Sequence, residues 1–135
     1  MKPSLQPGIS LVRRIPVGKD KTISFMGEDG RVYATPYLIG DIEYTCRNLI
    51  LEHAEPNEDS VGMEVAIKHL APTLPGSTVE IAATVIAVEG RKVTFAVTAK
   101  DEIDTISSGS HVRFVVDKAK TIERLKAKAA KLQGL

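Results

Sequence analysis

The sequence predicts an α+β domain in which one long helix packs against an antiparallel sheet. Apolar residues recur at helical spacing between Thr35 and Pro56. After Pro56 the pattern changes to the period-two alternation of strands, and it continues to about residue 116. Because the helical and strand patterns occupy separate parts of the chain, we expect the helix to cover one face of the sheet.

The predicted long helix has signals at both of its ends. Thr35 followed by Pro36 is typical of an N-cap and a first-turn proline, whose missing N–H costs no hydrogen bond there. Pro56 should end the helix. The residues that flank Glu43 are largely apolar or small, so we expect this helix to be covered on most sides.

Six segments are predicted to be strands. Two short ones, residues 9–17 and 22–25, precede the long helix, and four longer ones follow it at residues 62–71, 77–88, 92–99 and 105–116. Glu89-Gly90 and residues 101–104 are natural hairpin connections, which favour antiparallel neighbours.

The last segment, residues 117–135, is predicted to be an amphipathic helix with Asp117 as its N-cap. Its apolar stripe consists of Ile122, Leu125, Ala129 and Leu132. Six basic and two acidic residues give this segment a charge of +4, whereas twelve basic and fifteen acidic residues give the rest −3. A lysine-rich face of this kind is usually solvated.

Composition limits the classes of function. The net charge is only +1, aromatic residues make up 4% and tryptophan is absent, which argues against a platform that stacks nucleic-acid bases. One cysteine excludes an intramolecular disulfide or a cysteine-based metal cluster, and no segment approaches the ~20 apolar residues of a membrane span. We expect a single domain over residues 1–135 that is cytoplasmic and binds neither nucleic acid nor membranes.

The most informative segments are VYATPYLIGDIEYTC, VGMEVAIKHLAPTLPGSTV and SSGSHVRFVV. Together they resemble the fluoroacetyl-CoA thioesterase family of hotdog proteins, over most of the chain from Val32 to Val116. The resemblance implies a hotdog fold, in which a curved antiparallel sheet wraps a long central helix. It also implies an acyl-CoA thioesterase that works as a homodimer, with its sites at the subunit interface. Coenzyme A would be part of the substrate, and no separate cofactor or metal is expected.

The resemblance further implies the roles of five residues. Thr35, Glu43 and His69 match the family's catalytic set, and Gly62 and Arg113 match positions that contact the acyl group and coenzyme A. Thioester hydrolysis requires a nucleophile or activated water, a donor to the developing oxyanion and a proton for the leaving thiolate. A carboxylate, an imidazole and a hydroxyl at a helix N-terminus are suited to these tasks.

Each of these residues also has an ordinary interpretation. Thr35 could be only a cap, Glu43 could face water, His69 could be a core histidine and Arg113 an edge-strand charge. Three further residues are expected to be structural or solvated: His111, which shares a strand face with Arg113, His53 at the helix end, and Cys46 as a small buried hydrophobe.

The segment before Thr35 departs from the family. Members that favour fluoroacetyl groups carry a longer, phenylalanine-bearing lid there, whereas this chain has the short FMGEDGRVY. We therefore expect a short-chain acyl-CoA substrate without a preference for fluorine. Two alternatives stay open: a non-catalytic acyl-CoA-binding module, and a hotdog hydratase of enoyl-CoA, although the Asp/His pair of such hydratases is not found. The sequence also lacks a nucleotide-phosphate loop, a zinc pattern and a serine-hydrolase elbow.

Overall fold

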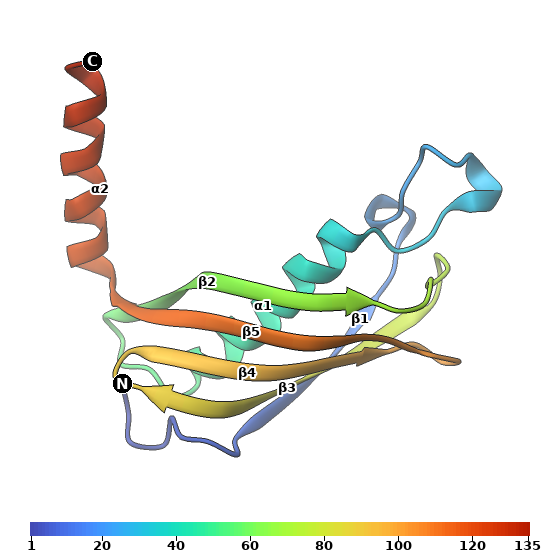
Figure 1. Ribbon diagram of the computed structural model, residues 1–135, viewed down its shortest axis with the longest axis horizontal. Helices are drawn as coiled ribbons and strands as arrows, with labels where there is room; N and C mark the ends of the chain where they lie inside the picture. The colour runs from blue at the N-terminus through green and yellow to red at the C-terminus, as the bar shows by residue number, and fades with distance from the viewer.

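Five antiparallel strands form one sheet, and a long helix lies along one of its faces (Figure 1). The computed structural model describes residues 1–135. In chain order the elements are β1 (Ser10–Pro16), η1 (Lys19–Lys21), η2 (Glu28–Gly30), α1 (Thr35–Leu51), β2 (Glu58–His69), β3 (Thr78–Glu89), β4 (Lys92–Lys100), β5 (Thr105–Asp117) and α2 (Lys118–Gln133). The strand order is β1-β3-β4-β5-β2, so β2 lies at one edge of the sheet. The predicted α+β class is confirmed.

The segment between β1 and α1 differs from the prediction. Residues 22–25, which lie between the short 3-10 turns η1 and η2, form no strand. Thr22 makes only an isolated bridge with Tyr33. Backbone hydrogen bonds such as that from Ile23 N–H to the Val32 carbonyl close this segment, and side-chain contacts hold it against α1. Lys21 Nζ lies 3.0 Å from Asp41 Oδ1, and the buried Tyr33 hydroxyl donates to the same carboxylate.

The core lies between α1 and the inner face of the sheet. The apolar stripe of α1, including Leu38, Ile42 and Leu49, packs with sheet residues such as Ile81 and Phe95. Burying side chains of this size contributes about 1.5–3 kcal/mol each. The opposite side of α1 is open, with Tyr37 and Tyr44 48% and 59% exposed. The expectation that α1 is covered on most sides is therefore wrong for the single chain.

A bulge in β2 controls which side chains face α1. Gly62 pairs with Arg113 of β5 and Glu64 pairs with Val112, so Met63 is an extra residue between them. In a regular strand Gly62 and His69, seven positions apart, would point to opposite faces. The extra residue shifts the alternation of side chains between the two faces of β2. As a result Gly62 lies opposite Arg113 and His69 lies opposite Ser107, and both of these β5 residues face inward.

β2 is also longer than expected at its start and exposed along its outer edge. It begins at Glu58 rather than residue 62 because Glu58 already pairs with Asp117, and it ends at His69 rather than residue 71. Val61 and Met63 are 47% and 57% exposed. An edge strand of this length leaves unpaired backbone groups that can pair with another chain.

The predicted terminal helix is present. The Asp117 side chain accepts a hydrogen bond from the backbone N–H of Lys120, as an N-cap does. None of the residues of α2 is buried, and the helix extends away from the sheet at the end where β5 finishes (Figure 1). Neither helix is long and apolar enough to cross a bilayer.

Candidate active site

The first residue of α1 meets the last residue of β2. Thr35 Oγ1 lies 2.8 Å from His69 Nδ1, within hydrogen-bond distance. Because this hydroxyl contacts His69, it does not cap the helix: the N-cap is Ala34, and it has no side-chain cap. The predicted N-cap role of Thr35 is wrong, but the predicted association of Thr35 with His69 is present in the fold.

The environment of His69 favours a neutral imidazole. Its Nε2 atom is buried and has no hydrogen-bond partner, and burial lowers the pKa of the ring below its ordinary value of 6.5. A neutral imidazole carries one N–H, so Nδ1 accepts the Thr35 proton only when Nε2 holds that hydrogen. A hydroxyl within reach of a neutral imidazole is the arrangement of a nucleophile and its base.

An open pocket of about 380 Å³, lined mostly by apolar residues, lies beside this pair. Thr35 and His69 contribute polar groups to its wall. The remaining lining comes from the segment before α1 and from the loop after β2: Ile23, Phe25, Val32, Tyr33, Ala34, Leu70, Ala71 and Pro72. An apolar space with few convergent polar groups suits a small acyl chain.

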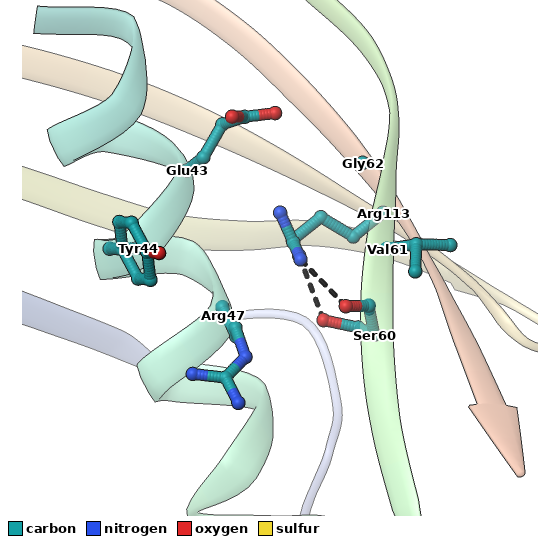
Figure 2. Close-up of a pocket in the computed structure, with 7 residues that line it drawn as sticks. All are labelled: Glu43, Tyr44, Arg47, Ser60, Val61, Gly62 and Arg113. Carbon is teal, nitrogen blue, oxygen red and sulfur yellow. Dashed lines mark hydrogen bonds between the residues drawn. The ribbon is translucent and has the colours of Figure 1, made fainter. Parts of the chain in front are cut away.

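The other three predicted residues meet about two helical turns further along α1. A Cβ atom on Gly62 would lie 2.7 Å from Glu43 Oε1, so any larger residue at this position would displace the Glu43 carboxylate, and it would make ordinary contact with Arg113 Nη1 at 3.6 Å. Glu43 points from α1 and Arg113 from β5 towards the same cavity (Figure 2). The cavity has a volume of about 450 Å³ and is lined by Glu43, Tyr44, Arg47, Ser60, Val61, Gly62 and Arg113.

Arg113 is a buried cation with fixed hydrogen bonds. Its Nε donates to Ser60 Oγ at 2.8 Å, and its Nη2 donates to the Ser60 carbonyl at 2.7 Å (Figure 2). Burial lowers the pKa of the guanidinium, whereas the Glu43 carboxylate acts in the opposite direction. The remaining nitrogen, Nη1, is directed towards His111 Nε2 at 3.2 Å.

His111 is held in one tautomer. Its Nδ1 lies 2.8 Å from the Glu64 carbonyl, which can only accept, so Nδ1 carries the hydrogen and Nε2 accepts from Arg113. Burial is the main cause that lowers the pKa of His111. The ring also stacks on Phe95, with centroids 6.4 Å apart. The structural role expected of His111 thus includes orienting Arg113.

The five predicted residues therefore form two separate groups in the chain. We call them the Thr35–His69 pair and the Glu43 cluster, which consists of Glu43, Gly62 and Arg113. The helix rises about 12 Å between Thr35 and Glu43. The strand extends roughly 20 Å between Gly62 and His69. A single thioester carbonyl does not contact both groups of one chain.

Sequence reasoning missed Ser60 and Arg47. Ser60 lay outside the predicted strand, and Arg47 is tied to Asp59 by a 2.7 Å ion pair that joins α1 to β2. Arg47 could have been found from its spacing, since it follows Glu43 by four residues on the same helix face. Cys46 is a buried thiol, as expected, and burial raises its pKa to about 12.

Comparisons with known proteins agree with the fold. The family described as fluoroacetyl-CoA-specific thioesterase matches residues 17–119. The fluoroacetyl-CoA thioesterase of Streptantibioticus cattleyicolor is 32% identical over an alignment of 123 residues, and the match covers 86% of this chain and 88% of that protein.

Solved structures of thioesterases also resemble this chain. The fluoroacetyl-CoA thioesterase FlK superposes with a TM-score of 0.84 at 30% identity, over 92% of this chain and 97% of that one. A Thermus thermophilus member of the thioesterase superfamily superposes with a TM-score of 0.90 at 28% identity, over the whole of both chains. A hot-dog-like protein from Thermanaerovibrio acidaminovorans, 20% identical with a TM-score of 0.82 over 90% of this chain and 91% of that one, shares the fold.

These likenesses confirm the predicted hotdog fold, with its curved sheet around a long helix. The family match spans most of the chain and includes all five predicted site residues, from Thr35 to Arg113. The chain belongs to the fluoroacetyl-CoA-specific thioesterase family of hotdog proteins.

Proposed function

We propose that the protein is an acyl-CoA thioesterase that hydrolyses a short-chain acyl-CoA to the free acid and coenzyme A. The observation that carries this proposal is the 2.8 Å contact between Thr35 Oγ1 and His69 Nδ1 beside an apolar cavity. Family membership supports the same chemistry, since the relatives are thioesterases of fluoroacetyl-CoA. The alternatives, a non-catalytic binding module and an enoyl-CoA hydratase, are not favoured by these relatives.

The working unit in this proposal is a homodimer formed through β2. Two copies of the exposed edge strand would pair antiparallel about a two-fold axis near Val65 and Ala66. Gly62 of one protomer would then lie close to the partner's His69, because the two residues are on opposite sides of that axis. The open edge of β2 and the exposed Tyr44, Val61 and Met63 support this interface.

Each active site would thus combine the Thr35–His69 pair of one protomer with the Glu43 cluster of its partner. His69 Nδ1 takes the proton of the Thr35 hydroxyl as Thr35 Oγ1 attacks the thioester carbonyl carbon. The tetrahedral intermediate collapses, the C–S bond breaks, and the leaving thiolate receives the proton from His69 Nδ1. Coenzyme A leaves, and the acyl group remains on Thr35 as an ester.

The Glu43 cluster serves the second half of the reaction. The Glu43 carboxylate takes a proton from water as the water oxygen attacks the ester carbonyl. Collapse of that intermediate releases the acid, and the proton returns to Thr35 Oγ1. Arg113 provides a fixed positive charge that attracts the Glu43 carboxylate, Gly62 leaves room for that carboxylate because it has no side chain, and the Gly62 backbone would contact the acyl group.

This chemistry uses only protein side chains and water, with coenzyme A as part of the substrate and no additional cofactor. A cytoplasmic site of action belongs to the same proposal. It is supported by the single cysteine, which is buried and has no disulfide partner in the chain.

Replacing Glu43 by Gln should lower kcat/KM for acetyl-CoA by about 10²- to 10⁴-fold, because the amide keeps the shape but does not accept the proton. Thermal unfolding and dimer mass should stay as in the wild type. Glu52→Gln, at the exposed end of the same helix, is the matched control and should be fully active. Wild-type turnover by Glu43→Gln would remove Glu43 from the mechanism.

His69→Ala should lower kcat by about 10²- to 10⁴-fold while KM changes little, since proton transfer acts in the transition state. The wild-type rate should rise with pH through a group with a pKa below about 6.5, because burial favours the neutral base. A pH profile of kcat for wild type, His69→Ala and the control His53→Ala measures both effects. A stable His69→Ala protein with normal kcat would show that the ring is only structural.

Acetyl-CoA and fluoroacetyl-CoA should be hydrolysed with kcat/KM values that differ by less than about tenfold. The reason lies in the segment before Thr35, where Phe25 is 82% exposed and the short turn η2 replaces a closed apolar lid. A competition assay between the two thioesters, followed by release of free thiol, measures the ratio. Strong selection of the fluorinated substrate would contradict this expectation.

A further inference from the structure

Two buried polar atoms without partners lie on facing residues of β2 and β5. His69 and Ser107 are directly opposite each other in the antiparallel ladder. His69 Nε2 and Ser107 Oγ are both buried, and neither makes a hydrogen bond. Buried polar side-chain atoms are nearly always paired in proteins, so two orphans at facing positions require an explanation.

The ladder places the two side chains on the same face. Directly opposite residues of an antiparallel pair have Cβ atoms about 5 Å apart and point to the same side of the sheet. On β5, Ser107 shares the inward face with His111 and Arg113, which lie opposite Val65 and Gly62. A hydrogen bond between Oγ and Nε2 would form directly after a rotation of the Ser107 side chain, or through one bridging water.

The chemistry of His69 requires an acceptor at this atom. If Nδ1 is to take the Thr35 proton, Nε2 must carry the hydrogen, and a buried N–H needs a partner. No group of another protomer or of the substrate reaches Nε2, because it is enclosed within its own chain. Ser107 Oγ is the acceptor that the register provides.

We propose that Ser107 is a positioning residue that accepts a hydrogen bond from His69 Nε2–H, directly or through one water. It holds the ring in the tautomer whose Nδ1 faces Thr35. Thr35, His69 and Ser107 then form a chain of nucleophile, base and orienting group. When His69 takes the proton, both ring nitrogens donate, and Ser107 also stabilises the cation. The effect on turnover rests on the proposed thioesterase function.

The experiment compares Ser107→Ala with Ser107→Thr, which keeps the hydroxyl, and with Ser110→Ala on the same strand. Long-range 1H–15N spectra of histidine-labelled protein show which ring nitrogen carries hydrogen, and His69→Gln identifies the signals of His69. The wild type and Ser107→Thr should hold the Nε2–H tautomer. Ser107→Ala should shift His69 towards the Nδ1–H form, whereas Ser110→Ala should leave it unchanged.

Kinetics provide the second measurement. In Ser107→Ala, kcat for acetyl-CoA should fall about tenfold with KM unchanged, corresponding to one lost hydrogen bond. The acid limb of its pH profile should move to lower pH, because the imidazolium loses an acceptor. Ser107→Thr should restore both values.

Unchanged tautomer and kcat in Ser107→Ala would overturn the proposal, including when the variant is less stable. The two measurements also separate this proposal from the function on which it rests. A tautomer shift in a protein that hydrolyses no acyl-CoA would retain the role of Ser107 and reject the thioesterase.

Discussion

The pairing of β2 with β5, with its bulge at Met63, is the constraint on which both parts of the site depend. The extra residue directs Gly62 and His69 to the same side of the sheet although they are an odd number of positions apart. On that side, β5 supplies Arg113 opposite Gly62 and Ser107 opposite His69. Without the bulge, either Gly62 or His69 would face away from α1.

The same strand explains why a single chain looks incomplete. α1 is buried against the sheet on one side, but the side that carries Tyr37 and Tyr44 is open, and the outer edge of β2 has no neighbour. The Thr35–His69 pair lies at one end of β2 and the Glu43 cluster near the other. Pairing two copies about a two-fold axis near the middle of β2 would cover the open surfaces. The same arrangement would bring the Thr35–His69 pair of one protomer next to the Glu43 cluster of its partner.

The sequence allowed β1, α1, β3, β4, β5 and α2 to be predicted, because apolar periodicity and caps are local signals. The bulge could not be predicted, since Gly62-Met63-Glu64 has no local pattern that marks an extra residue. The contacts that define the site could not be predicted either, because they join distant parts of the chain; Thr35 and His69, for example, are 34 residues apart. The resemblance to a family supplied those residues, whereas Ser107 became visible only through the register of two strands.

The most direct test of shared active sites uses mixed dimers of two inactive variants. His69→Ala and Glu43→Gln chains with different affinity tags are co-expressed, and the dimer that carries both tags is purified. One of its two sites then combines an intact Thr35–His69 pair with an intact Glu43 cluster, so the mixed dimer should recover about half of the wild-type kcat. A dimer of His69→Ala with Thr35→Ala, which damages the same pair in both chains, should stay inactive. If the His69→Ala and Glu43→Gln dimer is as inactive as its parents, each site lies within one chain and the account is wrong.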